Sequence, residues 1–468
     1  MTAALPDAPS SPAVPLRALD RRARLDAIAR TMAGVALWSG LLVVTYWWAG
    51  DGGIQDLSGW VSGPASVGRL SGLVAAFLLL VQVLLMARLP VLEGAFGQDR
   101  LARLHRLVGF TSFDLMVLHV VLATYADAGG LGRAPVALWG MVRHDPGMLL
   151  AAGGTVALVM VVVTSVRAAR RRIRYESWHL LHLYAYLGVG LALPHQLWAG
   201  QQFVSSPTRT IFWWTVWALA AGSVLAWRVS LPLWRNLRHR LRVTSVVAEG
   251  HGVVSVHLTG RRMDRFPAEA GQYLSWRFLT GRGWTRANPF SLSAAPDGRS
   301  LRITVQAVGD GSVATAALRP GTRALVEGPY GRLSARRRTR PKVALIGAGV
   351  GITPLRALAE GLDYAPGEAV LLHRYAADPL FVGELENIGR DRGLRLVASP
   401  GHRRAAGSWL GSGVGDVDDV TALRSWVPDI AEHDVYVCGP ARWTALVRTT
   451  LLEAGVPPAL VHVETFSW

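Results

Sequence analysis

The first half of the chain consists of apolar runs that are long enough to cross a membrane. Six runs carry almost no charge, and each approaches the roughly 20 residues that a helix needs to span a ~30 Å hydrocarbon core. They comprise residues 31–50, 70–87, 107–126, 147–166, 178–199 and 210–227. Because a chain in lipid must satisfy its own backbone groups, the pattern predicts a bundle of six transmembrane helices.

Arginine residues indicate the direction of these helices. They cluster before the first run, between the second and third, between the fourth and fifth, and after the sixth. The other loops carry only Arg69, Arg133, Arg143 and Arg209. By the positive-inside rule both chain ends are cytoplasmic. We therefore expect a multi-pass protein of the cell membrane. The partner of its positive charge, +17 in all, is expected to be the lipid bilayer with its anionic headgroups. We expect no nucleic-acid partner and no obligatory protein partner.

Composition divides the chain into four parts and predicts a multi-domain membrane protein. Residues 1–28 are rich in Pro, Ala and Ser and are expected to form a disordered tail. Residues 29–235 hold the apolar runs. Residues 238–338 contain short alternating strands, which predict an antiparallel β-barrel. Residues 340–468 alternate strands with helices, which predicts an α/β Rossmann-like domain.

Histidine is costly inside a membrane, so histidines in the apolar runs point to a function. The third run has His105 near its inner end and His119 towards its outer end, and the fifth has His182 and His195 at corresponding depths. Two facing imidazoles at each of two depths can hold two stacked haems, each iron with two axial histidines. At 1.5 Å of rise per residue, the two levels lie about 20 Å apart.

Helical geometry accounts for one of these spacings and not for the other. The histidines of the third run return to within about 40° of the same face, whereas His195 lies about 220° round an ideal helix from His182. We therefore expect the fifth helix to be distorted, with Gly188, Gly190 and Pro194 as the residues that permit it. His179 is an alternative inner ligand.

The fifth run, YESWHLLHLYAYLGVGLALPH, resembles the haem-binding fifth helix of the transmembrane ferric reductase / NADPH oxidase superfamily. The third run is similar to that family's third helix in its spacing of histidines, and the resemblance extends from about residue 30 to the chain end. It favours His182 over His179, because Glu176 precedes His182 by six residues. It implies an inner haem b on His105 and His182 and an outer haem b on His119 and His195.

The string RANPFSLSAAP resembles the flavin motif of the same family. The resemblance implies that Phe290 lies against the isoalloxazine ring of FAD and that Ser291 bonds near its N5, with Pro289 also in the FAD site. Asn288 stands where the family usually has the His or Arg that contacts the flavin diphosphate. Arg286, two positions earlier, is a candidate to take over this contact.

A glycine-containing segment further along is a second candidate for FAD binding. Gly309, Gly311 and Ser312 open a helix-like stretch, whose N-terminus would offer N–H groups to a pyrophosphate. An ordinary turn is the alternative reading of the same residues.

The segment PKVALIGAGVGITPLRAL has the pattern of a nucleotide-binding loop. A buried strand is followed by Gly347, Gly349 and Gly351, then by Thr353-Pro354 and a helix. Glycines let the backbone approach a pyrophosphate at the start of a helix. The combination resembles the nucleotide loop of ferredoxin reductase-like domains.

Arginines near the next strand bear on the choice of nucleotide. Arg374 follows the strand AVLLHRY and is placed to meet an adenosine ribose or 2′-phosphate, and Arg403 and Arg404 are further candidates. No acidic residue is evident at the end of that strand, which favours NADPH, with NADH as the alternative. Solvated surface arginines would give the same pattern.

Two segments near the chain end resemble the nicotinamide site of the family. Cys438, Gly439 and Pro440 end a strand and match the segment that lies beside the nicotinamide, although Cys438 could equally be a small core residue. The family tends to end in an aromatic residue that covers the flavin. Trp468 is the match, with Phe466 as the alternative.

Together these resemblances imply a transmembrane NAD(P)H oxidoreductase with FAD and two b haems, in which electrons reach an acceptor outside the cell. Phe290, Ser291, Cys438 and Trp468 would lie nearest the chemistry. The outer loops show no clear metal-ligand cluster, which favours oxygen as a small-molecule acceptor over ferric or cupric chelates. A membrane electron-transfer subunit for a partner protein is the third possibility.

Overall fold

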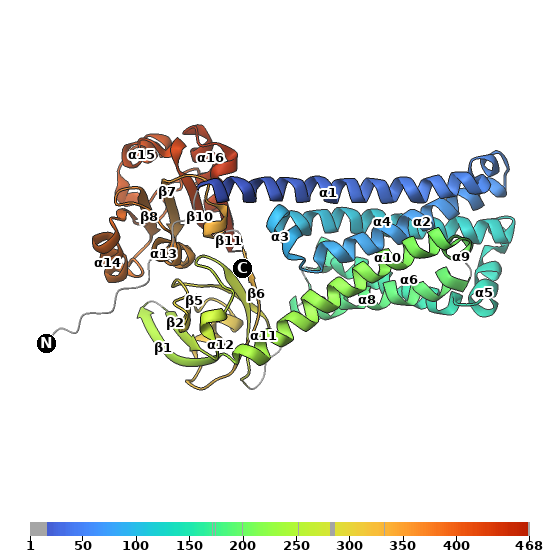
Figure 1. The fold of residues 1–468 in the computed structure, drawn as a ribbon, viewed down its shortest axis with the longest axis horizontal. Helices are drawn as coiled ribbons and strands as arrows, with labels where there is room; N and C mark the ends of the chain where they lie inside the picture. Colours follow the sequence, from blue (N-terminus) through green and yellow to red (C-terminus); the bar gives the residue numbers. More distant parts are fainter. Residues whose placement is uncertain are drawn as a thin grey trace. The chain divides into compact units, whose positions relative to one another are not determined.

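The computed structural model describes residues 16–170, 172–173, 175–198, 200–250, 252–280, 286–331 and 333–466. The chain forms two compact units (Figure 1). One unit is Leu25–Leu231, and the other is Pro232–Trp468 together with Met1–Arg24. The first holds the apolar runs of the sequence, and the second holds the predicted strands.

Helices build the unit Leu25–Leu231, and several of them run alongside one another as a bundle (Figure 1). Their bounds, with those of the helix that follows, are α1 (Leu16–Trp48), α2 (Ser62–Met86), α3 (Pro90–Phe96), α4 (Gln98–Ala128), α5 (Ala134–His144), α6 (Met148–Ser165), α7 (Arg167–Arg170), α8 (Tyr175–Trp198), α9 (Gln201–Val204), α10 (Pro207–Ser223) and α11 (Leu231–His239). A π-helical segment, Val224–Ser230, joins α10 to α11 without a break.

Five helical stretches among the described residues are long and apolar enough to cross a membrane. They are Arg24–Gly53, Ser62–Met86, Arg100–Ala128, Met148–Ser165 and Pro207–His239. They coincide with five of the six predicted runs. Helix α8 covers the remaining run and has 24 residues, but its three histidines and Pro194 make it less apolar. The prediction of a membrane-spanning helical half is confirmed, and the sixth span stays a prediction.

The start of α1 corrects one expectation. We expected residues 1–28 to be a disordered tail, but α1 begins at Leu16, so the expectation is wrong for residues 16–28. This stretch is rich in Ala, Leu and Arg, which are among the strongest helix formers. Residues 1–15 lie outside the described part of the chain.

Small residues let the helices approach closely, as is common where packing must occur in lipid. Helix α6 crosses α8 at Gly154 and Gly188: a Cβ on Gly154 would lie 2.7 Å from the carbonyl oxygen of Gly188. The neighbouring Gly153 faces more open space, since its Cβ would come no nearer than 3.9 Å to Leu191. Gly154 is therefore required for the close approach and Gly153 is not.

This difference predicts the stability of two adjacent variants. Gly154→Ala should lower the thermal unfolding midpoint of the purified protein, because forcing a methyl group into a packed contact costs about 1–3 kcal/mol. Gly153→Ala should leave the midpoint unchanged or raise it, because alanine favours helix by about 1 kcal/mol over glycine. Equal midpoints for the two variants would contradict the packing.

Two antiparallel sheets open the second unit. One has the order β1 (Arg242–Gly250), β2 (Val253–Thr259), β5 (Ser300–Gln306), and the other has the order β4 (Asn288–Ser291), β3 (Tyr273–Phe278), β6 (Ala324–Tyr330). The strands are antiparallel as expected and form two separate sheets, so closure into one barrel stays a prediction. Only isolated bridges, Arg242–Arg323 and Leu292–Ile303, join the sheets among the described residues. One core, which includes Trp276 and Leu274, fills the space between them.

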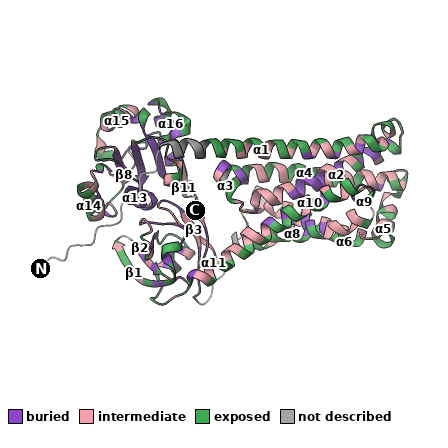
Figure 2. Cartoon of the chain, viewed as in Figure 1, coloured by how far each residue is buried: buried purple, intermediate pink, exposed green. Residues whose placement is uncertain are grey.

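A parallel sheet follows, as the alternation of strands and helices predicts. Its order is β11 (Val461–Phe466), β10 (Asp434–Pro440), β7 (Val343–Ala348), β8 (Ala369–Tyr375), β9 (Arg395–Pro400). It is accompanied by α13 (Ile352–Gly361), α14 (Val382–Arg392), α15 (Asp419–Trp426) and α16 (Ala441–Glu453). Every residue of β7, a central strand of this sheet, is buried (Figure 2). The strand order reverses between β7 and β10, and such a switch point is where open α/β sheets bind ligands.

Candidate functional site

The four predicted haem-ligand histidines form two facing pairs between α4 and α8. The ring centres of His105 and His182 lie 6.0 Å apart, and those of His119 and His195 lie 6.4 Å apart. A bond between a transition metal and an imidazole nitrogen is about 2 Å long, so two imidazoles on opposite sides of one metal ion have ring centres about 6 Å apart. The spacing of both pairs therefore fits one iron between each.

Hydrogen bonds hold each of these four rings by its Nδ1 atom. The partners are the carbonyl oxygens of Gln82 for His105 (3.1 Å), Gly68 for His119 (2.8 Å) and Ala192 for His195 (2.8 Å), and the Oγ of Ser165 for His182 (3.3 Å). A carbonyl oxygen can only accept, so in a neutral ring bonded to it Nδ1 carries the proton and Nε2 keeps its lone pair. This is the usual arrangement of a metal-ligating histidine.

The surrounding helices leave space for the rings only because they carry glycine. A Cβ on Gly72 of α2 would lie 2.6 Å from the Nδ1 of His119, and a Cβ on Gly147 would lie 2.7 Å from the backbone nitrogen of His195. Sequence reasoning identified the histidines and missed these glycines. Their signal is visible in α2, where glycine recurs at positions 68 and 72.

The inner pair bears on the choice between His182 and His179 as the inner ligand. The ring that faces His105 is that of His182, which the sequence favoured over His179. Trp178 packs beside His182 with ring centres 5.0 Å apart, and its Nε1 donates to the Oγ of Ser165 at 3.3 Å. The side chain of Glu176 lies outside the described residues. Helix α8 continues through Gly188 and Gly190 with Pro194 inside it.

The number of protein ligands at each pair bears on whether a bare metal ion or a haem would fit there. Within the described ranges, no group of three or more His, Cys, Asp or Glu side chains gathers as a metal site. Two imidazoles alone leave most positions round an iron open, and a porphyrin supplies the four equatorial nitrogens. The histidine pairs therefore fit haem better than a bare ion.

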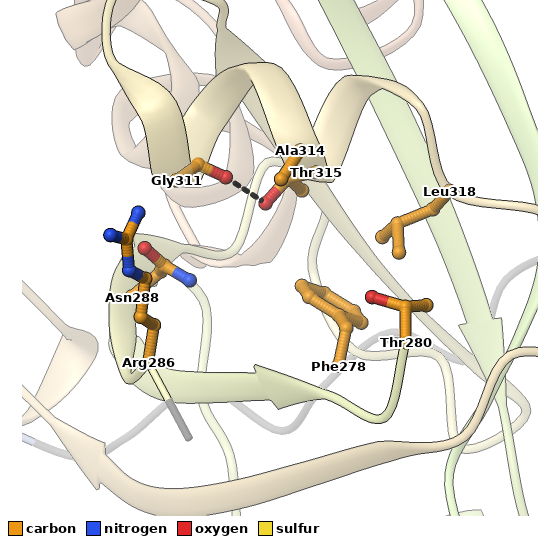
Figure 3. A pocket seen from close by; sticks show the side chains of 8 residues that line it. All are labelled: Phe278, Thr280, Arg286, Asn288, Gly311, Ala314, Thr315 and Leu318. Atoms are coloured by element: carbon orange, nitrogen blue, oxygen red, sulfur yellow. Dashed lines mark hydrogen bonds between the residues drawn. The ribbon is translucent and has the colours of Figure 1, made fainter. Parts of the chain in front are cut away.

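A cavity of about 230 Å³ lies in the sheet domain beside α12 (Asp310–Ala316) (Figure 3). It is lined by Phe278, Thr280, Arg286, Asn288, Gly311, Ala314, Thr315 and Leu318. Ligand pockets usually measure about 300–1,000 Å³, so this one could hold part of a dinucleotide. Three of its residues, Arg286, Asn288 and Gly311, are among those predicted to bind FAD.

The polar end of this cavity carries mixed charge. The guanidinium of Arg286 lies 3.8 Å from the carboxylate of Asp310, and Asn288 offers an amide that can both donate and accept. Gly311 faces the Asn288 side chain so closely that a Cβ there would collide with its Oδ1. The structure thus brings Arg286, Asn288 and Gly311 together, as an anion-binding role for them requires.

Ser312 lies in the first turn of α12, as expected, and its hydroxyl bonds to the backbone there. Its Oγ accepts hydrogen bonds from the backbone N–H groups of Val308 and Gly309, both at 2.9 Å, and donates to the carbonyl of Gly309 at 2.8 Å. The hydroxyl caps the seven-residue helix α12 and is occupied by these contacts. A contact of Ser312 with FAD stays a prediction.

The close approach of Gly311 to Asn288 predicts how two glycine variants bind FAD. Gly311→Ala should push the Asn288 side chain into the cavity and weaken FAD binding by about tenfold, equivalent to about 1.4 kcal/mol. Gly309→Ala is the matched control, because a Cβ at Gly309 meets nothing within 4 Å. Titration of the FAD-depleted protein with FAD would measure both affinities. Equal affinities would contradict the assignment of this cavity.

The aromatic residue of the flavin motif is more buried than expected. Phe290 is 9% exposed and packs in the core of the two sheets, and its carbonyl accepts a hydrogen bond from the Nε1 of Trp276 at 3.1 Å. Pro289 is exposed and Ser291 is buried in the same short strand, β4. A contact of Phe290 or Ser291 with the flavin ring stays a prediction.

The glycine loop lies at the switch point of the parallel sheet. Gly347 is the next-to-last residue of the buried strand β7, and a Cβ there would lie 2.9 Å from the side chain of Leu355. Gly349 has a positive φ of 53° and open space around its Cβ position, which suits a backbone that approaches a ligand. Gly351 lies against the backbone of Cys438, so the loops after β7 and β10 meet.

The residues after the two strands are buried. Thr353 and Pro354 are buried in the first turn of α13, and Cys438 is fully buried. Burial and the nearby charge of Glu464 raise the pKa of the Cys438 thiol, which therefore stays protonated at neutral pH. Cys438 is thus suited to pack beside a nicotinamide and not to act as a nucleophile. Gly439 permits the contact with Trp443, since a Cβ would lie 2.8 Å from that ring.

Two residues near this junction were missed from the sequence. Glu464 of β11 pairs in register with Cys438 of β10, and a Cβ on Gly331 would lie 2.6 Å from its Oε1. His373 is 5% exposed at the end of β8. Burial lowers the pKa of His373 to about 4, although its hydrogen bond to the Gly349 backbone opposes the shift. His373 is therefore neutral at physiological pH.

The three candidate arginines have different surroundings. Burial and the positive charge of Arg403 lower the pKa of Arg374, so these two guanidinium groups face the same region. Arg404 instead lies 3.7 Å from Asp416 and 4.0 Å from Asp419. Two neighbouring cations that repel each other would be stabilised by a phosphate, which makes Arg374 and Arg403 the better candidates for a 2′-phosphate.

Phe466 and Trp468, at the end of the sequence, are the residues predicted to cover the flavin. The backbone of Phe466 ends β11 opposite Pro440. The side chain of Phe466 and the whole of Trp468 lie outside the described residues. Their predicted contacts with the flavin are therefore still predictions.

A charge cluster joins the antiparallel sheets to the parallel sheet. Glu384 of α14 accepts two hydrogen bonds from Arg302 of β5, at 2.8 and 2.9 Å, and lies 2.7 Å from Arg356 of α13. Burial raises the pKa of Glu384, but the hydrogen bonds and charges of these arginines outweigh it and hold the pKa below the ordinary range of glutamate. The carboxylate thus fixes the two domains against each other.

Replacing this carboxylate predicts a loss of stability with a defined pH dependence. Glu384→Gln should lower the unfolding midpoint by about 3–6 °C, for a pair of intermediate exposure worth about 1–2 kcal/mol. In the folded protein the pKa of Glu384 lies below the unfolded value of about 4.3. The stability difference between wild type and Glu384→Gln should therefore be fully present at neutral pH and vanish as the pH falls through the folded pKa. The exposed Glu386 of the same helix, changed to Gln, is the control. A pH-independent difference would contradict this account.

Comparison with known proteins separates the chain into the same two halves. Residues 71–193 match a family described as "Ferric reductase like transmembrane component", and this segment contains His105, His119 and His182. A flavohemoprotein of Deinococcus radiodurans is 32% identical over 248 residues, which cover 50% of this chain and 60% of that protein. An NADPH oxidoreductase of Mycobacterium tuberculosis is 27% identical over 248 residues, which cover 50% of this chain and 62% of that protein.

The chain thus spans less than two thirds of either relative. Among solved structures, the flavohem-like FAD/NAD binding domain of nitric oxide dioxygenase from Vibrio cholerae O1 biovar El Tor is 24% identical, with a TM-score of 0.38 over 49% of this chain and 99% of that domain. The sequence relatives support FAD and NAD(P)H binding by an oxidoreductase half attached to the membrane half.

Proposed function

We propose that the chain, which resembles the ferric reductase / NADPH oxidase superfamily, is a transmembrane oxidoreductase that takes electrons from cytoplasmic NADPH and delivers them to an acceptor on the opposite side. The observation that carries the proposal is the pair of facing imidazoles at each of two levels of the helix bundle. Such pairs inside apolar helices have no evident use in packing alone.

Each group that this activity needs would have a place in the chain. His105 and His182 would hold an inner haem b and His119 and His195 an outer one, with Nε2 of each ring directed to iron. When bound, FAD accepts a hydride from a nicotinamide and haem iron carries single electrons. The cavity at Asn288 would bind part of FAD.

The second unit would bind the nucleotide across the switch point of its parallel sheet. The glycine loop after β7 would let the backbone approach a pyrophosphate, since Gly349 has a positive φ and open space around its Cβ position. The nicotinamide would lie near the end of β10, beside Cys438 and its neighbour Glu464. Arg374 and Arg403 would bind the 2′-phosphate, which favours NADPH over NADH.

The finer features of the fold follow from the same proposal. Helix α8 would be the sixth span, since two of its histidines face α4 within the apolar bundle. The bridges Arg242–Arg323 and Leu292–Ile303 support closure of the antiparallel sheets into a barrel. Arginine-rich loops support a plasma-membrane protein with both chain ends in the cytoplasm.

Oxygen is the acceptor that the chain favours, which would make superoxide the product. The outer loops offer Arg133, Arg143, His144 and Trp198 and no cluster of metal ligands in the sequence. Reduction of ferric or cupric chelates is the second candidate, favoured by the family that residues 71–193 match. NADPH turnover with superoxide and ferric-chelate reduction measured side by side, with and without oxygen, separates them. NADPH oxidation with neither product would contradict both.

Loss of an outer ligand should remove one haem and leave the nucleotide end working. His119→Ala should lower the haem content from about two to about one per chain and weaken the low-spin absorbance of bis-histidine iron. Reduction of FAD by NADPH should be unchanged, because His119 belongs to the other unit. His144→Ala, an exposed histidine of α5, should keep both haems. An unchanged haem content in His119→Ala would contradict the ligand assignment.

Nucleotide choice should depend on the paired arginines. Arg374→Gln should raise the KM for NADPH about tenfold, since a charge-assisted bond to phosphate is lost, and should change the KM for NADH little. Arg390→Gln is the control, because Arg390 lies on α14 and bonds to Asn387. Steady-state reduction of FAD by each nucleotide gives both constants. Equal changes with NADPH and NADH would exclude a role in binding the 2′-phosphate.

A further inference from the structure

Helix α11 has the reverse of the usual amphipathic arrangement for a helix attached to a soluble domain. Its polar side is bonded to the protein, and its apolar side is exposed. The helix follows the last membrane span directly, and from Pro232 onward it belongs to the same compact unit as the antiparallel sheets.

The polar side of α11 is fixed by specific hydrogen bonds. The side-chain amide of Asn236 bonds to both the N–H and the carbonyl of Val326 in β6, each at 2.8 Å, and so covers an edge strand. Arg235 donates to the carbonyl of Gly328 in the same strand. His239 is 1% exposed, and its Nδ1 lies 3.1 Å from the carbonyl oxygen of Arg261. The orientation of α11 on the sheet domain is therefore well defined.

The opposite side of α11 presents three large apolar side chains. Leu233 is 57% exposed, Trp234 53% and Leu237 60%. At about 100° per residue they occupy an arc of about 100°, which is one continuous face. Single exposed apolar residues are ordinary, but a face of this kind indicates a binding surface.

The position of α11 in the chain indicates what covers this face. The continuous helical stretch Pro207–His239 has 33 residues. At 1.5 Å per residue it is about 50 Å long, which exceeds the ~30 Å hydrocarbon core. The last turns of this stretch, which are those of α11, must therefore lie at or beyond the lipid headgroups.

The residues around the face match the chemistry of that region. Tryptophan is enriched at membrane–water interfaces, and arginine is attracted to anionic headgroups. The guanidinium of Arg238 lies 4.8 Å from the ring centre of Trp234, and the exposed Arg240 and Arg242 follow. Apolar side chains bordered by arginines are typical of helices that lie in the interface.

We propose that α11 carries the last span into the headgroup region of an anionic leaflet, where its face of Leu233, Trp234 and Leu237 contacts lipid. Asn236 and His239 on its other side attach the helix to the antiparallel sheets. The lipid contact does not depend on the identity of the electron acceptor or on haem binding.

Site-directed fluorescence quenching in nanodiscs tests this location. The native Cys438 is fully buried, so a cysteine introduced by Leu237→Cys or, separately, Leu233→Cys can be labelled selectively with an environment-sensitive fluorophore. Leu219→Cys, on an exposed face of α10, reports the lipid environment, and Leu452→Cys, on α16, reports water. The full-length protein is placed in nanodiscs with 30% phosphatidylglycerol (roughly the anionic content that such segments need).

Doxyl groups placed high on the acyl chain should quench the probes at 233 and 237 at least about threefold more than the probe at 452, as for an interfacial helix. Iodide, which is dissolved in water, should quench the probes at 233 and 237 less than the probe at 452. Iodide quenching equal to that at 452, without doxyl quenching, would place the face in water and overturn the proposal. Protection from both quenchers would place it against a second copy or another protein and would equally overturn it.

Discussion

The hydrogen bonds that hold the Nδ1 atoms of four imidazoles are the interaction on which the proposed electron path depends. In hydrocarbon an unbonded ring nitrogen costs several kcal/mol, so each bond both satisfies the ring and fixes its rotation. Gln82 and Gly68 of α2 hold the rings of α4, and Ser165 of α6 holds His182 of α8. The bundle therefore does more than cross the membrane: its packing partners determine which nitrogen each histidine presents to its neighbour.

In the second unit, too, contacts between distant segments fix the groups of the proposed site. The glycine loop after β7 and the segment after β10 meet at the switch point because Gly351 permits a backbone contact with Cys438. Glu384 joins that parallel sheet to the antiparallel sheets through Arg302 and Arg356. Close backbone approach and a shared carboxylate thus define the geometry in which a nicotinamide and a flavin would meet.

The sequence predicted the features that depend on local pattern. Apolar runs, histidine spacing and the Gly-x-Gly-x-Gly segment are each encoded within about one element. The features it missed depend on contacts between distant segments. Glu464 acquires its place beside Cys438 only through the register of β10 and β11, and Phe290 is buried by strands that precede and follow it. The helical start at Leu16 shows that composition alone does not separate a tail from a helix.

Transfer of electrons across the bilayer is the central claim, and sealed proteoliposomes test it directly. The protein is inserted with its nucleotide domain outward, ferricyanide is trapped inside under anaerobic conditions, and NADPH is added outside. The account predicts reduction of the trapped ferricyanide at a rate that depends on FAD and haem loading. Rapid oxidation of NADPH by ferricyanide added outside, with the trapped ferricyanide remaining oxidised, would contradict it.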